Sequence, residues 1–242
     1  MAEEENGPEV AAAAPPDPAE EAACVPHPLD RDGFNSRCRI PFGVTTDQIA
    51  STMQEFLSFL GFINGSLRTK RIKRFETMLM PANFSSLVGE FMSASIPTYC
   101  HSIAKNTYHN GHPDLVPKGM FPNDSVQHSD KGIEVKGSRY LKAWQGHNAE
   151  DTWLMVFVFD SNRPVDASRS IGPKSFRFVK VVGASLTKSD WKFAGRSSTS
   201  RRTITASVLD SGYTKMEANW IYRDRALTGL VERKEKQGEL EL

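Results

Sequence analysis

The chain has 242 residues, of which 39% are hydrophobic and 24% charged, a composition typical of a globular protein with a sizeable core. No apolar run approaches the roughly 20 residues of a membrane-spanning helix, and the acidic start lacks the positive region of a secretory signal. Three cysteines without CxxC spacing argue against a disulfide framework or a structural zinc site, so we expect a cytoplasmic protein.

The net charge of +1 hides an uneven distribution along the chain. Residues 1–32 carry nine acids and one base, a net of −8, which leaves a net of +9 on residues 33–242. An excess of this size suits a polyanionic partner such as DNA, although many soluble domains carry one and bind no nucleic acid.

The two ends of the chain differ in composition from its body. Residues 1–32 are rich in Ala, Pro and Glu and contain no aromatic residue, so we expect a disordered acidic tail. Residues 230–242 are predicted to form a charged C-terminal tail. Residues 33–229 are then expected to form a single domain.

The first predicted elements of this domain are helices. Residues 45–60 place apolar side chains at helical spacing behind a capping threonine, which predicts a helix ending before Gly61. A basic run follows at residues 68–74, and residues 81–100 predict a second helix.

Strands dominate after Pro97. They are predicted at 115–116, 132–138, 152–160, 175–186 and 202–209, with a closing helix at 218–227. The run "TWLMVFVFD" at 152–160 is continuously apolar, as expected of a strand buried on both faces. Helices followed by strands indicate an α/β (α+β) fold with a mixed central β-sheet flanked by helices.

The segments "HPD" and "IEVKG" carry the residues best suited to chemistry. Glu134 and Lys136 are two positions apart, so on a strand they share one face while Val135 points into the core. Asp114 precedes Glu134 by 20 positions, with a Pro- and Gly-rich turn between them, which allows an adjacent strand. Carboxylates are preferred Mg²⁺ ligands, and a lysine can orient water or stabilise charge on a phosphate.

Pro113–Asp114 followed by Glu134–Lys136 resembles the signature of the PD-(D/E)XK nuclease superfamily, which includes many type II restriction endonucleases. The resemblance covers about residues 85–185. It implies a restriction-endonuclease-like fold and a Mg²⁺-dependent endonuclease, with Mn²⁺ as a substitute, that hydrolyses phosphodiester bonds in a specific duplex DNA sequence. It also implies a homodimer and, as a genetic partner, a cognate methyltransferase.

The resemblance further implies roles for individual residues. Asp114, Glu134 and the Val135 carbonyl would bind the metal, and Lys136 would assist the attacking water. Glu90, on the helix before the PD segment, would supply a further acidic group to the catalytic site.

Cations and amides elsewhere are candidate DNA contacts, because Lys and Arg neutralise phosphates and amides bind base edges. They lie after Lys136, in a basic stretch near the C-terminal end and after the first helix: Arg139, Lys142, Gln145, His147, Asn148, Lys188, Lys192, Arg196, Arg201, Arg202, Arg68, Lys70 and Arg71. Each segment also has a plainer interpretation as a polar loop or a solvated helix face. We interpret His109, His112 and His128 as turn or surface residues, because their spacing is irregular.

Other functions fit the same sequence. One alternative is a non-catalytic DNA-binding protein on a nuclease-like scaffold, and another is a repair-type or nonspecific nuclease of the same superfamily. A small-molecule enzyme lacks support, since the sequence has no phosphate-binding glycine loop or GxSxG motif. "GHN" at 146–148 is similar to part of the ββα-metal nuclease motif, but no suitable second histidine pattern accompanies it.

Overall fold

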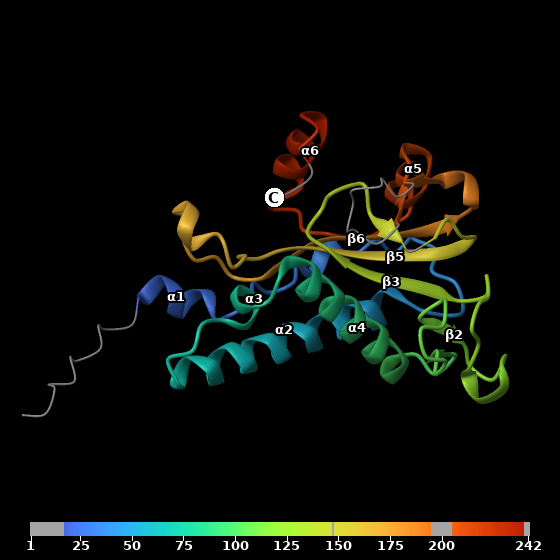
Figure 1. Ribbon diagram of the computed structural model, residues 1–242, viewed down its shortest axis with the longest axis horizontal. Coiled ribbons are helices and arrows are strands. Elements are labelled where there is room, and N and C mark those ends of the chain that lie inside the picture. Colours follow the sequence, from blue (N-terminus) through green and yellow to red (C-terminus); the bar gives the residue numbers. More distant parts are fainter. Residues whose placement is uncertain (1–16, 147, 195–204, 240–242) are drawn as a thin grey trace, which may run out of the picture.

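A computed structural model describes residues 17–146, 148–194 and 205–239. Its main feature is a six-stranded mixed sheet in the order β1-β2-β3-β5-β6-β9 (Figure 1). The strands are β1 (Ile103–Lys105), β2 (Leu115–Pro117), β3 (Ile133–Ser138), β5 (Thr152–Asp160), β6 (Arg177–Leu186) and β9 (Trp220–Arg223). Strands β3 and β5 run parallel, and the other neighbouring pairs are antiparallel. The expected mixed α/β architecture is therefore confirmed.

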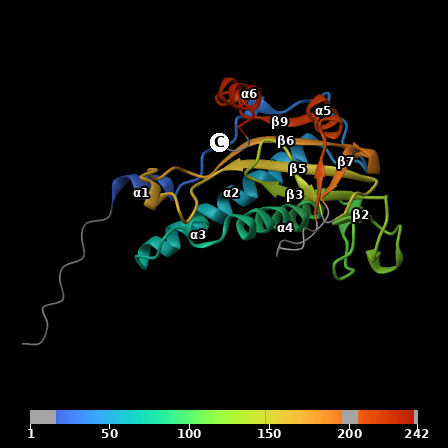
Figure 2. The same ribbon diagram turned by 45° about the horizontal axis from the view of Figure 1, so that its top comes forward.

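Helices lie on both faces of this sheet (Figures 1 and 2). One face is covered by α2 (Thr46–Thr69) and α4 (Pro81–Tyr99), with α1 (Pro18–Ala23) and α3 (Phe75–Met78) beside the C-terminal end of α2. The other face carries α5 (Asp210–Ala218) and α6 (Thr228–Lys236). A small antiparallel sheet, β4-β8-β7, consists of β4 (Gln145–Gly146), β8 (Thr205–Val208) and β7 (Trp191–Ala194).

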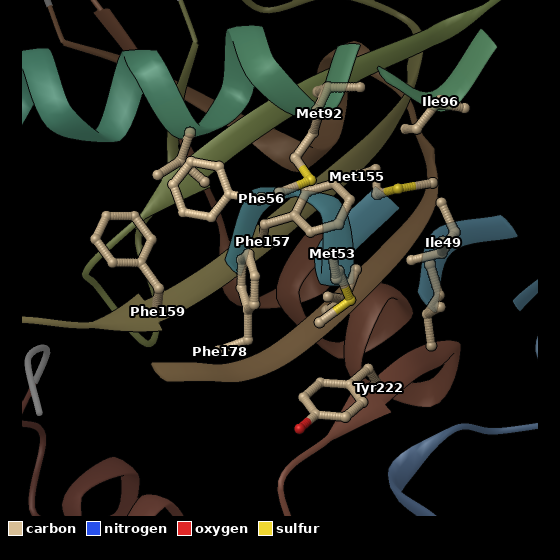
Figure 3. Close-up of a cluster of buried hydrophobic side chains, with 14 of the residues drawn as sticks. Ile49, Met53, Phe56, Met92, Ile96, Met155, Phe157, Phe159, Phe178 and Tyr222 are labelled. Carbon is tan, nitrogen blue, oxygen red and sulfur yellow. The ribbon is translucent and has the colours of Figure 1, made fainter. Parts of the chain in front are cut away.

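Strand β5 is buried on both faces, as its apolar run predicts. Met155, Phe157 and Phe159 point into a core shared with α2, α4 and β6, where Phe56 of α2 and Met92 of α4 also lie (Figure 3). Its alternate residues, Leu154, Val156 and Val158, point into a second core on the opposite face. Small-sheet side chains close this second core: Trp191, Ala206 and Val208.

The predicted boundaries of the disordered tail are wrong within the described residues. Asp17 caps α1 by accepting a hydrogen bond from the Ala19 amide at 2.9 Å, and Ala23 is buried. The buried Arg74 guanidinium lies 2.8 Å from the Glu20 carboxylate. Composition alone cannot identify this helix, because the cation that holds it lies 54 positions further along the chain.

The C-terminal end also departs from the prediction. Residues 228–236 form α6, and Glu235 accepts a hydrogen bond from the buried Lys180 amine at 2.7 Å, so this part of the expected tail is folded. Residues 220–223 form strand β9 rather than part of a closing helix, with Tyr222 wholly buried in the first core. Helix α2 continues past Gly61 to Thr69.

Candidate functional site

Strand β3 presents Glu134 and Lys136 on one face, as their two-residue spacing predicts. Val135 faces the opposite way, into the core beneath α2 and α4. The Lys136 amine lies 2.9 Å from Oε1 of Glu134, and the two side chains are only 20% and 13% exposed. The face of β3 opposite α2 and α4 therefore holds a nearly buried ion pair.

Asp114 joins this pair from the start of β2. The antiparallel pairing of Leu115 with Ile133 continues backwards to place Asp114 beside Glu134. Oδ2 of Asp114 accepts a hydrogen bond from the Val135 amide at 2.8 Å. Beyond the Leu115–Ile133 pair, the Asp114 side chain thus accepts the hydrogen bond that a backbone carbonyl would otherwise accept. The three residues of the predicted site, Asp114, Glu134 and Lys136, are therefore adjacent.

His112 belongs to the same cluster, so its interpretation as a turn or surface residue is wrong. Its Nδ1 lies 3.0 Å from Oε2 of Glu134, and its Nε2 lies 2.8 Å from Oε2 of Glu150, out of line for a hydrogen bond. The ring stacks on His128 with centroids 5.5 Å apart. The position of His112 two residues before Asp114 is the sequence signal that places it here. Glu150 gives no such signal, because it approaches only through the fold.

The charges in this cluster shift one another's protonation. Burial raises the pKa of Asp114, and the nearby Glu134 charge raises it further, to about 7. Burial alone would raise the pKa of Glu134, but the Lys136 and His112 cations lower it to about 2. Burial opposes the charged form of Lys136, yet Glu134 and Asp114 hold its pKa above the ordinary value. Near neutral pH, Glu134 and Lys136 are ionised while Asp114 titrates.

Helix α4 packs against β3 backbone to backbone, which brings Glu90 near the cluster. A Cβ on Gly89 would lie 3.1 Å from the Gly137 amide nitrogen, so only glycine fits this approach without displacement. The Glu90 charge is close enough to raise the pKa of Asp114. Its carboxylate, 67% exposed, nevertheless lies 2.8 Å from the Lys105 amine. Glu90 therefore borders the cluster without joining its buried part.

The donor set offers oxygen atoms for a hard cation. Among the described residues there is no group of three or more His, Cys, Asp or Glu side chains placed to hold a metal ion. The predicted set is smaller, with two carboxylates, from Asp114 and Glu134, and the Val135 carbonyl. That carbonyl belongs to the same residue whose amide donates to the Asp114 carboxylate. Each Glu134 oxygen lies beside a cation, so a metal at this carboxylate would displace Lys136 or His112.

The predicted DNA contacts differ in where their side chains lie. The prediction for Arg139 is wrong, because its guanidinium is buried and donates to the Ser161 and Asn162 carbonyl oxygens at 2.6 and 3.2 Å. Lys142 is half-buried, with its amine 4.9 Å from the Tyr213 ring centroid. Both residues belong to the segment that follows Lys136, and their side chains pack against the fold.

The remaining contacts divide by position. Arg68, which lies 3.3 Å from Glu21, and the exposed Lys70 and Arg71 sit at the C-terminal end of α2, away from β2 and β3 (Figures 1 and 2). Exposed side chains on or beside the small sheet are Gln145, Asn148, Lys188 and Lys192. His147, Arg196, Arg201 and Arg202 lie outside the described residues.

In comparisons with known proteins, no family model, no curated protein and no solved structure matches the chain. Within the described residues, no helix is both long and apolar enough to span a membrane. Inferences about function therefore rest on the chemistry of the cluster itself.

Proposed function

We propose that the protein is a Mg²⁺-dependent DNA endonuclease with a PD-(D/E)XK core, of the type found in restriction enzymes. The observation that carries the proposal is the adjacency of Asp114, Glu134 and Lys136 at the β2–β3 junction. Two carboxylates and one amine in a nearly buried setting are the groups needed to hold a divalent cation beside a phosphodiester.

The residues of the cluster fit such a cation. Burial raises the pKa of Asp114, and the negative charge of Glu134 raises it further. A hard dication would relieve that repulsion and favour the ionised form of Asp114. Asp114, Glu134 and the Val135 carbonyl would then hold Mg²⁺, or Mn²⁺ in its place, and bound metal would neutralise the phosphate and lower the pKa of a water.

Lys136 would act through its positive charge and not as a proton acceptor. Its pKa is raised, so the amine is protonated at neutral pH and suits stabilisation of the developing negative charge on the phosphate. Attack by water forms a new P–O bond and breaks the P–O bond to one sugar. One proton passes to solvent, and a phosphomonoester and a hydroxyl remain.

Duplex DNA is the substrate we propose, because the net charge of +9 on residues 33–242 favours a polyanion. Restriction enzymes of this type commonly cut both strands as homodimers. We therefore include a homodimer in the proposal, together with a cognate methyltransferase as the genetic partner of a restriction system.

One observation favours a second candidate, a DNA-binding protein that does not cut. Both Glu134 oxygens already lie beside cations, Lys136 and His112, and this ion-pair network is complete without a metal. Such a protein would bind duplex DNA equally well in EDTA and in Mg²⁺ and would leave it intact.

Incubation of supercoiled plasmid or phage DNA with the protein separates these candidates. The endonuclease proposal predicts cleavage in Mg²⁺ or Mn²⁺ and none in EDTA, with a banded digest for a restriction-type enzyme. A smear would indicate a repair-type or nonspecific nuclease. Tight DNA binding without cleavage in either metal would support the second candidate and overturn the first.

A further inference from the structure

We propose that the outward face of the small β4-β8-β7 sheet reads base edges in the major groove, through Gln145, Ser207 and Lys192. This inference rests on the proposed function, since it names the surface by which that site would be directed to particular sequences. It assigns a place in the fold to two of the predicted DNA contacts and adds Ser207 to them.

The strand register aligns these three side chains in one row. Ser207 of β8 pairs with Gln145 of β4 on one side and with Lys192 of β7 on the other. Directly paired residues in a sheet project from the same face. The opposite face carries Ala206, which is wholly buried in the second core, while Gln145 and Lys192 are exposed and Ser207 is half-buried. The row therefore faces outward from the molecule.

The chemistry of the row suits base recognition. A glutamine amide pairs with the N6 and N7 positions of adenine, a lysine amine with O6 and N7 of guanine, and a serine hydroxyl with either purine. The adjoining charges favour a polyanion: Lys188 is exposed beside β7, whereas Asp190 is buried and paired with Lys215 at 2.6 Å. An acid is present nearby in Asp151, whose carboxylate accepts from the Lys188 amide at 2.8 Å.

The width of the row discriminates between nucleic acids. Neighbouring strands lie about 4.8 Å apart, so the outer two side chains are separated by about 10 Å. That width matches the major groove of B-DNA, about 12 Å, and the groove admits β-ribbons. The major groove of duplex RNA is deep and too narrow for side chains to read. Duplex DNA is accordingly the partner that this face fits.

Two contacts made by Glu150 connect the neighbourhood of the row to the candidate active site. The Trp191 indole nitrogen, one residue before Lys192, donates to the Glu150 carbonyl oxygen at 2.9 Å. The carboxylate of that same Glu150 lies 2.8 Å from Nε2 of His112 in the cluster. The five-residue step from Gln145 to Glu150 spans at most about 17 Å, so the row lies on the same part of the molecule as the cluster.

The test is selection of bound duplexes from a randomised DNA library by wild-type protein in EDTA, which needs no cleavage. We expect an enriched motif with adenine and guanine positions. Gln145→Ala should relax the adenine preference and Lys192→Ala the guanine preference, each by about 5- to 100-fold, as expected for loss of one base contact. Lys236→Ala, which removes an exposed lysine from α6, is the matched control and should leave the motif unchanged.

Three outcomes would overturn the inference: the same motif from all four proteins, no motif from the wild type, or equal affinity for duplex RNA. A wild type that selects the motif but does not cut DNA in Mg²⁺ would overturn the proposed nuclease function and support the reading surface. A wild type that cuts DNA but selects no motif would support the proposed nuclease function and overturn the reading surface.

Discussion

Oδ2 of Asp114 accepts a hydrogen bond from the Val135 amide at 2.8 Å, so the first carboxylate of the cluster is fixed to the strand that bears Glu134 and Lys136. This bond holds an acidic group beside Glu134 although the two charges repel. A backbone hydrogen bond thus holds Asp114, whereas Glu134 lies beside the Lys136 amine and the His112 ring. The pH dependence and the variants below follow from this arrangement.

Asp114→Asn should stabilise the metal-free protein, and more so at pH 8 than at pH 5. The pKa of Asp114 rises from 3.8 to about 7 on folding, so the folded state binds a proton that the unfolded state releases in this range. Stability is therefore lost as pH rises from about 4 through 7. An asparagine oxygen still accepts from the Val135 amide but carries no charge. Thermal unfolding in EDTA measures the effect, and an equal gain at both pH values would contradict the account.

Glu134→Gln should have the opposite effect on stability. Glu134 lies beside two cations, and its pKa of about 2 means that its contribution is present above pH 4.5 and lost as pH falls through 2. Removing its charge leaves Lys136 and His112 in a nearly buried site without their shared partner, at a cost of roughly 3–5 kcal/mol at pH 7. Urea unfolding measures this cost.

The double variant Glu134→Gln, Lys136→Met is the control for this pairing. It removes both members of the ion pair, so part of the stability lost in the single variant should return. If the double variant is as unstable as the sum of the two single variants, the pair contributes nothing and this account of the cluster fails.

The sequence predicts the residues that share one strand more readily than those that meet through the fold. The common face of Glu134 and Lys136 follows from a period of two, and the burial of β5 follows from its unbroken apolar run. The place of Asp114 follows from a 20-position separation that allows an adjacent-strand return. Each of these inferences depends on residues that are close together in the sequence.

Glu150 and Arg139 could not be placed in this way. Glu150 lies beside His112 only in the folded chain, and the residues next to it in the sequence do not predict that contact. Arg139 reads as a DNA contact by residue type alone. In the fold its guanidinium packs over the Phe159 ring with 5.1 Å to the centroid, a contact between residues 20 positions apart in the chain.

Gly137→Ala should destabilise the protein by about 1–3 kcal/mol, as expected for an overpacked contact. A Cβ at this position would overlap the Ser85 carbonyl oxygen of α4, so the helix must move away from β3 next to Lys136. Gly65→Ala on α2 is the matched control, because nothing lies within 4 Å of its added Cβ and alanine favours a helix. Thermal unfolding should show the first variant destabilised and the second unchanged or stabilised; equal shifts would argue against the tight α4–β3 contact.

Glu235→Gln should loosen α6. The amine of Lys180, only 3% exposed, is held by Glu217 at 2.6 Å and Glu235 at 2.7 Å, so the variant removes one of two carboxylates from a buried cation. The expected loss is about 1–3 kcal/mol, as for a hydrogen bond to a charged group. Hydrogen exchange of α6 amides measures it, with Glu232→Gln, an exposed acid on the same helix, as the control. Unchanged exchange in both variants would show that Glu235 does not anchor the helix.

Single-turnover cleavage of supercoiled plasmid in Mg²⁺, comparing wild type with Asp114→Asn, tests the central claim most directly. The metal-free variant should be folded and at least as stable as the metal-free wild type, so loss of activity cannot come from unfolding. We expect the wild type to cut and the variant to cut at least ~100-fold more slowly, as expected when a group that stabilises the transition state is lost. Cleavage by the variant at the wild-type rate, or no cleavage by the wild type in Mg²⁺ or Mn²⁺, would contradict the assignment of this cluster as a nuclease site.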